Sequence, residues 1–199
     1  MEWKELVALP QEELTKVRYD DRRLDSFANE VERKYGLPDD LIVAVKNAGE
    51  RSNTEQVSRS GAKGVMQFMD ATRKMYDHDY KDPLASIDAA GRFFKDLLKQ
   101  YDGDVKAAVA HYNGGTKAGK AVLKGMEPPS EETRNYWKRM QTYMEERASV
   151  PKNIAPTVVA APVAPAPVEA PAVVAVAPKQ ERVLKYDAGG KRMPSLAEK

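Results

Sequence analysis

The chain has 199 residues, of which 42% are apolar, and 32 basic and 30 acidic side chains give it a net charge of only +2. This length suits one domain with additional segments, and the near-neutral charge argues against a strongly basic nucleic-acid-binding face. There is no cysteine to form a disulfide or a thiolate metal site, and no proline-free apolar run of about 18 residues that would predict a transmembrane helix.

The N-terminal residues do not resemble a secretory signal peptide. The stretch MEWKELVALPQEELTK is acidic and is interrupted by Pro10, whereas a signal peptide has a basic start followed by an apolar run. Residues 1–22 are therefore expected to form an N-terminal extension.

Helical patterns follow almost without interruption over residues 24–145. Apolar side chains recur at i, i+3, i+4 and i+7 over residues 24–35, and Gly36 is expected to end this first helix. A second helix is predicted over residues 38–49, and a third over residues 64–76.

The later part of the pattern predicts four more helices. The fourth starts at Pro83 and ends at the turn formed by residues 102–104. A fifth covers residues 105–113 and a sixth residues 116–124, separated by two glycines, and the last opens at Ser130. No strand is predicted, so the expected fold class is a compact all-α domain.

The composition changes after about Ser149. Residues 151–178 contain seven prolines among mostly alanine and valine, which disfavours both helix and sheet. We expect a linker over residues 149–178, followed by a peptide over residues 179–199 that is either disordered or docks on a partner.

Metal and cofactor chemistry are not expected. The only histidines, His78 and His111, stand far apart and in no ligand spacing, and neither is accompanied by a serine in a glycine-rich elbow. The prediction is an enzyme or binding module without metal or cofactor.

One carboxylate stands out in the stretch GERSNTEQVSRSGAKGVMQFM. Glu50 lies where the apolar second helix ends, so the helix dipole and apolar neighbours would raise its pKa and keep it protonated near neutral pH. Such an acid can donate a proton to a leaving oxygen. Gly61 and Gly64 allow the backbone to pass close to a ligand, and Gln67 either meets a core partner or faces a cleft. On spacing alone, a solvated glutamate with no catalytic role remains an alternative.

Three motifs in order resemble the family 1 lytic transglycosylases, whose soluble lytic transglycosylase (SLT) domain has a fold similar to goose-type lysozyme. The first comprises Glu50 and the run from Ser58 to Met69, the second is AHYNGG at 110–115, and the third is EETRNYW at 131–137. The resemblance covers roughly residues 25–146, and it implies an SLT-type domain over residues 23–148 with a lysozyme-like, all-α architecture.

The resemblance implies a catalytic mechanism and a set of site residues. Glu50 would be the acid and then the base in a non-hydrolytic cleavage of the MurNAc–GlcNAc β-1,4 bond in peptidoglycan that leaves a 1,6-anhydroMurNAc end. Glu55 is the nearest alternative acid. The substrate-binding residues carried over from the motifs are Ser58, Gly64, Met66, Gln67, Met69, Tyr112, Asn113 and Tyr136. Met66, Met69 and Tyr136 could instead belong to the core.

A peptidoglycan-cleaving enzyme without a signal peptide needs another route to its substrate. The expected setting is a phage virion, in which residues 179–199 would dock on other virion proteins. The alternatives are a phage endolysin that stays in the host cytoplasm until holin-mediated release, a lysozyme-type hydrolase, and an inactive structural or glycan-binding virion protein.

Overall fold

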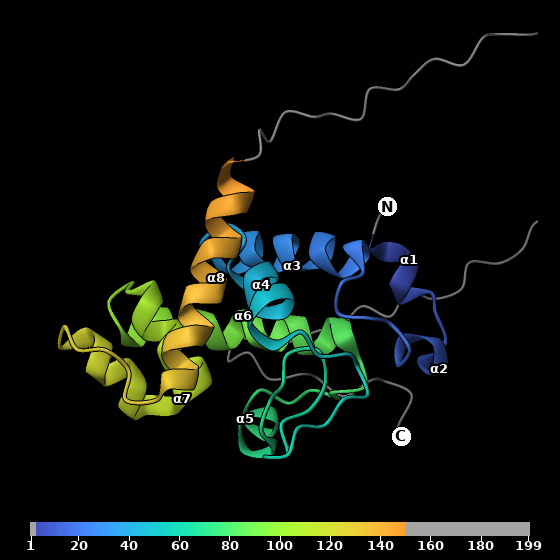
Figure 1. Ribbon diagram of the computed structural model, residues 1–199. Helices are drawn as coiled ribbons and strands as arrows, with labels where there is room; N and C mark the ends of the chain where they lie inside the picture. Colours follow the sequence, from blue (N-terminus) through green and yellow to red (C-terminus); the bar gives the residue numbers. More distant parts are fainter. Residues whose placement is uncertain (1–2, 150–199) are drawn as a thin grey trace, which may run out of the picture. The chain divides into compact units, whose positions relative to one another are not determined.

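The computed structural model describes residues 3–149, and the regular structure in that range is helical throughout (Figure 1). This confirms the predicted all-α class. The elements in chain order are α1 (Lys4–Val7), α2 (Gln11–Leu14), α3 (Arg22–Tyr35), α4 (Leu41–Ala44), the π-helix η1 (Val45–Glu50), α5 (Asp70–Met75), α6 (Pro83–Gln100), α7 (Val105–Leu123) and α8 (Glu131–Ser149). Apart from Ser149, the expected linker and C-terminal peptide lie outside the described residues.

Helix α3 packs along α6 and forms one side of the core. The Asp21 carboxylate caps α3 by accepting a hydrogen bond of 2.9 Å from the Arg23 amide, and Gly36 ends the helix in the left-handed conformation at φ 66°. On α6, a Cβ at Gly91 would stand 2.3 Å from Val31 Cγ1, so only glycine permits this close helix contact.

The N-terminal segment contributes to the same core. Leu6, Leu14 and Val17 are buried among the core residues, and the Thr54 hydroxyl donates a hydrogen bond of 3.0 Å to the Val17 carbonyl. The segment expected as an extension of the domain therefore packs against the elements that follow it.

The second expected helix changes its hydrogen-bond pattern halfway. It is α-helical only over α4, and it continues as η1, where the Arg51 amide donates to the Lys46 carbonyl at 3.1 Å, five residues back. The prediction of a single α-helix was wrong here. The wider turn is of the kind that often occurs at functional sites.

The third expected helix starts later than predicted. Residues 64–69 form turns, and the helix α5 begins only at Asp70. Gly64 and Gln67 both have positive φ, at 74° and 44°, and Lys63 pairs with Phe68 in an isolated β-bridge. The apolar run that suggested a helix is buried because it folds back as a loop.

The remaining boundaries agree closely with the sequence pattern. Helix α6 has Pro83 in its first turn, and the Asp82 side chain caps it. Helix α7 is kinked at Gly115, whose φ of 74° and ψ of −177° separate the two helical pieces that the sequence predicted. Helix α8 starts at Glu131, one residue after the expected Ser130.

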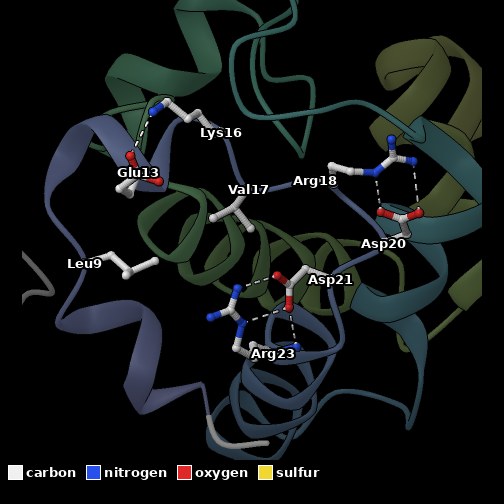
Figure 2. Close-up of a pocket in the computed structure, with 8 residues that line it drawn as sticks. All are labelled: Leu9, Glu13, Lys16, Val17, Arg18, Asp20, Asp21 and Arg23. Carbon is white, nitrogen blue, oxygen red and sulfur yellow. Dashed lines mark hydrogen bonds and ion pairs between the residues drawn. The ribbon is translucent and has the colours of Figure 1, made fainter.

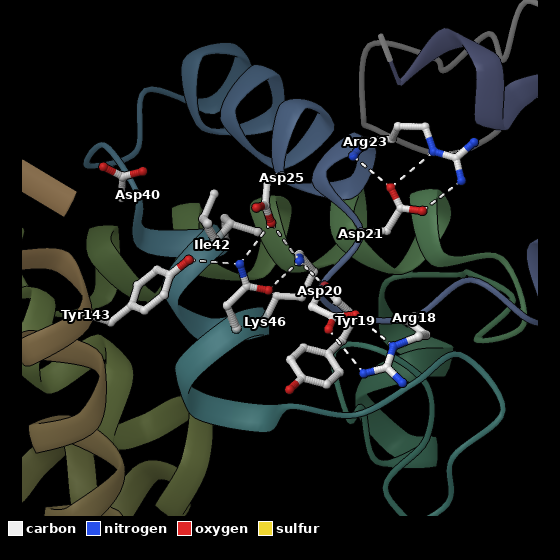
Figure 3. A network of polar contacts seen from close by, with 12 residues as sticks. Arg18, Tyr19, Asp20, Asp21, Arg23, Asp25, Asp40, Ile42, Lys46 and Tyr143 are labelled. Carbon is white, nitrogen blue, oxygen red and sulfur yellow. Dashed lines mark hydrogen bonds and ion pairs between the residues drawn. The ribbon is translucent and has the colours of Figure 1, made fainter. Parts of the chain in front are cut away.

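A buried ion pair joins η1 to α3 (Figure 3). The side chain of Lys46 is completely buried, its Nζ lies 2.8 Å from Asp25 Oδ1, and it also donates to the Tyr19 carbonyl. The Asn47 amide bridges onward by donating to Asp25 and to the Tyr143 hydroxyl of α8, each at 2.9 Å. This network ties the start of η1 to three other parts of the chain.

Candidate active site

The site is centred on Glu50, the last residue of η1. The Tyr136 hydroxyl of α8 donates a hydrogen bond of 2.8 Å to Glu50 Oε1, across 86 residues of sequence. The ring of Tyr136 is buried in the core, so its hydroxyl has a fixed position. The structure thereby joins the first and third sequence motifs.

The surroundings leave the Glu50 carboxyl partly protonated near neutral pH. Burial raises its pKa to about 7, and the negative charge of Glu132 acts in the same direction. The hydrogen bond from Tyr136 and the positive charge of Arg139 lower the pKa, and burial outweighs them. The result is an acid that can both give and take a proton at neutral pH.

Gly49 makes room for the hydrogen bond between Tyr136 and Glu50. A Cβ at position 49 would stand 2.4 Å from Tyr136 Oη and 2.5 Å from Cζ of the same ring. From the sequence, Gly49 was expected only to end the second helix. Its position directly before Glu50 is the sequence signal that could have indicated this close approach of another side chain.

Three side chains hold the C-terminal end of η1. Arg139 Nε donates to the Ala48 carbonyl at 3.2 Å, and Arg51 Nε donates to the same carbonyl at 3.2 Å. The Ser52 hydroxyl, which is buried, donates to the Glu50 carbonyl at 3.2 Å. These contacts satisfy carbonyls that a helix end leaves open. Arg139, which lies one helical turn after Tyr136, was not among the site residues predicted from the sequence.

The loop from Ser58 to Phe68 is closed by its own hydrogen bonds. The Ser58 hydroxyl accepts from the Ala62 amide at 3.0 Å, and the Gln67 side chain donates to the Gly64 carbonyl at 2.8 Å. A Cβ at Gly64 would lie 2.8 Å from the Tyr80 carbonyl oxygen. Ser58, Gly64 and Gln67 therefore shape this loop, and their contacts with a ligand remain a prediction.

The two methionines of the motif differ in exposure. Met66 is fully buried in the core, so its side chain offers no contact to a ligand in this conformation. Met69 is 46% exposed, which leaves its side chain accessible to a ligand.

The second motif lies against the first. The Tyr112 hydroxyl donates to the Met66 carbonyl at 2.5 Å, and its ring stacks on Phe94 with 4.8 Å between centroids. Burial, followed by the negative charge of Glu50, raises the Tyr112 pKa, so this phenol lies within the electrostatic reach of the acid. Asn113 is half-buried, and its side chain forms no hydrogen bond within residues 3–149. Its amide is thus available to a ligand.

Two surface hollows occur near the N-terminal segment and beside η1. The first, of about 360 Å³, is lined by Leu9, Glu13, Lys16, Val17, Arg18, Asp20, Asp21 and Arg23 (Figure 2). The second, of about 390 Å³, is lined by Asn47, Ala48, Arg51, Lys138, Arg139, Thr142, Tyr143 and Glu146. The second hollow shares the end of η1 with the site.

Neither a metal site nor a membrane span is found among the described residues. No group of three or more histidine, aspartate or glutamate side chains in residues 3–149 is placed to hold a metal ion. The helices of that same range are all too short or too polar to cross a bilayer.

Comparisons with known proteins agree with the motifs. Residues 26–137 match the family model described as Transglycosylase SLT domain. The peptidoglycan transglycosylase gp16 of Escherichia phage T7 is 31% identical over 119 residues, which cover 53% of this chain and 9% of gp16. The chain thus spans about a tenth of the length of this curated relative.

A solved structure has the same fold. It is an inactive mutant of the lytic transglycosylase Slt from Pseudomonas aeruginosa, and it aligns with a TM-score of 0.53 at 21% identity. The alignment covers 62% of this chain and 24% of Slt.

Proposed function

Because the chain belongs to the transglycosylase SLT domain family, we propose that it is a peptidoglycan lytic transglycosylase with Glu50 as its catalytic acid and base. The observation that carries this proposal is the half-buried Glu50 side chain, whose pKa burial raises to about 7 and whose carboxyl Tyr136 holds in place at 2.8 Å. The phage relative is named a peptidoglycan transglycosylase, and this similarity supports peptidoglycan as the substrate of this chain.

The reaction uses one carboxyl group twice. Protonated Glu50 gives its proton to the glycosidic oxygen of the MurNAc–GlcNAc bond, and the C1–O bond breaks. The N-acetyl carbonyl of the substrate stabilises the positive charge that develops at C1. The Glu50 carboxylate then takes the proton of the MurNAc 6-hydroxyl as that oxygen bonds to C1, which forms the 1,6-anhydro ring and consumes no water.

The residues around Glu50 have supporting roles in this proposal. Tyr136 orients the carboxyl and stabilises its anionic form between the two steps. Asn113 and the exposed Met69 face the glycan, while Ser58, Gly64 and Gln67 keep the loop in shape. Tyr112 holds the Met66 carbonyl and thereby joins this loop to α7.

A lysozyme-type hydrolase is the second candidate. Hydrolysis in its usual forms needs a second carboxylate, either as nucleophile or as base for a water molecule. Glu132, at the start of α8, is the other carboxylate whose charge acts on Glu50. In a hydrolase it would have to be the nucleophile or the base that activates the water molecule.

Product analysis and one substitution test the proposal. Purified peptidoglycan is digested with the full chain, and the fragments are identified by mass spectrometry. We expect 1,6-anhydroMurNAc ends; reducing ends would establish the hydrolase.

In the Glu50→Gln variant, which cannot transfer the proton, we expect cleavage to fall by about 10²- to 10⁴-fold. Glu55→Gln, in the exposed loop, is the matched control. Near wild-type cleavage by Glu50→Gln would exclude the assignment.

The setting that we propose is a phage particle. The support is the resemblance to a phage transglycosylase and the proline-rich sequence after Ser149, which suits a tether with residues 179–199 as the docking peptide. Truncation at Ser149 should then remove the protein from purified particles while its activity on isolated peptidoglycan persists. Absence of the full-length protein from particles would favour an endolysin.

A further inference from the structure

A hydrogen bond joins the end of α6 to the middle of α7. The Tyr101 hydroxyl and His111 Nδ1 lie 2.8 Å apart, and the Tyr101 ring is buried at the C-terminal cap of α6. On the other side of the imidazole, Nε2 lies 3.5 Å from the Thr116 hydroxyl. The His111 ring therefore bridges the kink at Gly115, because His111 lies before the kink and Thr116 lies after it.

The neutral form of the His111 ring satisfies both contacts. Burial lowers the pKa of His111, so the ring is uncharged at neutral pH. A neutral imidazole has one nitrogen that accepts a hydrogen bond and one that donates. When Nε2 carries the proton, the Tyr101 hydroxyl donates to Nδ1 and Nε2 donates to the Thr116 hydroxyl. One ring thus holds two partners at once.

The second helical piece of α7 packs closely on the Tyr101 hydroxyl. A Cβ at Gly119 would stand 2.4 Å from Tyr101 Oη and 2.9 Å from the Ala107 carbonyl oxygen. Only glycine permits this approach. The hydroxyl therefore contacts the first piece of α7 through His111 and the second piece at Gly119, so its position affects the angle at which the two pieces meet.

The short segment between His111 and the kink carries Asn113. This segment fits tightly against α8, because a Cβ at Gly114 would stand 2.6 Å from Thr133 Oγ1. Helix α8 is also the helix that holds the catalytic carboxyl through its tyrosine. The position of Asn113 relative to that carboxyl thus depends on the contact with α8 and on the pair of Tyr101 and His111.

His111 can act on the glycan site only through the backbone. Successive residues of an α-helix turn by about 100°, so His111 and Asn113 project about 160° apart around the axis of α7. A ligand on the Asn113 amide is therefore on the side of the helix opposite the imidazole, whose partners are Tyr101 and Thr116.

We propose that the pair of Tyr101 and His111, which we call the α6–α7 clamp, sets the angle of the kink in α7 and thereby positions the Asn113 amide for the glycan. His111 is a positioning residue and does not touch the substrate. Without the clamp, the two glycines at 114 and 115 allow the backbone other angles, and the amide loses its fixed position. The inference rests on the proposed function, because it takes Asn113 as a glycan contact.

The clamp predicts a specific change in the kinetic constants. His111→Leu removes both polar contacts of the ring and keeps an apolar side chain. We expect KM on soluble glycan strands to rise roughly three- to tenfold, as for the loss of about one hydrogen bond, while kcat stays close to that of the wild type. Tyr101→Phe removes the same hydrogen bond from the other side and should raise KM by a similar factor. It keeps the test decisive if His111→Leu does not fold.

A conservative variant and a control distinguish the hydrogen bond from packing. His111→Asn keeps a polar atom at the position of Nδ1, so its KM should stay close to the wild-type value. Lys120→Leu introduces the same leucine at an exposed position of α7 beyond the kink, and it should leave KM and kcat unchanged. A rise of KM in His111→Asn or in Lys120→Leu equal to that in His111→Leu would overturn the clamp.

A mutant cycle with Asn113 tests whether His111 acts through that amide. In the Asn113→Ala background, His111→Leu should cause no further rise in KM, because the side chain that it positions has been removed. A further rise of the same size would show that His111 acts elsewhere. An unchanged KM in Asn113→Ala would likewise overturn the clamp.

Direct binding separates the clamp from the proposed function. The tetrasaccharide of alternating GlcNAc and MurNAc is titrated calorimetrically into the full chain carrying Glu50→Gln, with and without His111→Leu or His111→Asn. Weaker binding with His111→Leu that is restored in His111→Asn supports the clamp even if the wild type cleaves no peptidoglycan, in which case the proposed function fails alone. Equal binding and equal KM with and without His111→Leu would overturn the clamp and leave the proposed function intact. A Glu50→Gln chain that does not bind the tetrasaccharide would overturn the clamp as well.

Discussion

At the scale of single residues, burial and the hydrogen bond from Tyr136 act in opposite directions on the pKa of Glu50. The phenol donates to the carboxyl at 2.8 Å and so stabilises the anionic form, in opposition to the burial that raises the pKa to about 7. The balance between the two effects keeps the acid available in both protonation states at neutral pH.

Replacing Tyr136 with phenylalanine should shift the pH profile of cleavage. In the proposed reaction the general acid must be protonated, so we expect wild-type activity to fall as the pH rises through the Glu50 pKa of about 7. Without the phenol the carboxylate loses a stabilising partner, and the pKa of Glu50 rises further. The alkaline limb of kcat/KM against pH should therefore move to higher pH. A shift to lower pH would contradict this account.

Alanine at Gly49 should disrupt the same hydrogen bond without touching either partner. Its Cβ would stand 2.4 Å from Tyr136 Oη, and the buried ring can only move by disturbing the core. We expect a loss of about 1–3 kcal/mol in the free energy of unfolding, together with lower activity. Urea denaturation measures the change in the free energy of unfolding. In Gly61→Ala the added methyl group meets no atom within 4 Å, so this variant tests backbone strain alone. It should retain more activity than Gly49→Ala.

At the scale of elements, the helices themselves could be predicted, but the geometry at the site could not. Apolar spacing and end signals placed α3, α6, α7 and α8 within about two residues. Periodicity does not reveal hydrogen-bond register, so the π turn of η1 was read as α-helix. It also does not distinguish a buried loop from a buried helix, which is why residues 64–69 were assigned wrongly.

The same distinction applies to the site residues. Glu50 and Tyr136 could be named from their motifs, and the structure brings them together. The contacts of Arg139 and the space at Gly49 depend on how α8 crosses η1, and no local pattern encodes that crossing. Met66 shows the reverse case, since its place in the motif suggested a ligand contact and its side chain is buried.

The buried ion pair between Lys46 and Asp25 holds η1 on α3, and it can be dissected by a mutant cycle. Lys46→Met removes the ion-pair partner of the Asp25 carboxylate and leaves it the hydrogen bond from the Asn47 amide, and we expect the variant to destabilise the fold by about 3 kcal/mol. Adding Asp25→Asn removes the unpaired charge, so the double variant should regain part of the lost free energy of unfolding. Urea denaturation of the single and double variants measures this, and a double variant less stable than Lys46→Met would refute it.

At the scale of the whole molecule, the folded unit is larger than the segment that the family model matches. The match begins at residue 26, whereas Leu6, Leu14 and Val17 already lie in the core. The N-terminal segment also holds Lys46 through the Tyr19 carbonyl, so it supports the helix that carries the acid.

Leu6→Ala tests the contribution of this segment. Leu6 is fully buried, and its truncation should cost about 2–5 kcal/mol in the free energy of unfolding through lost apolar contact and the cavity that remains. The change is measured by thermal or urea unfolding. Val7→Ala, at a neighbouring residue that is 58% exposed, should have little effect. Equal stability of both variants would show that the segment is dispensable.

The π turn of η1 has a consequence for how this chain can change in length. A π turn holds one more residue than an α turn, so a single inserted codon in an ancestral α-helix is enough to create it. Deleting one residue between Val45 and Gly49 would restore α-helical bonding, and because the narrower turn compensates for the lost residue, Glu50 would keep roughly its direction toward Tyr136. The wider turn therefore lets this segment lose one residue while the pair of Glu50 and Tyr136 stays together, whereas a deletion within a regular α-helix turns every following side chain by about 100°.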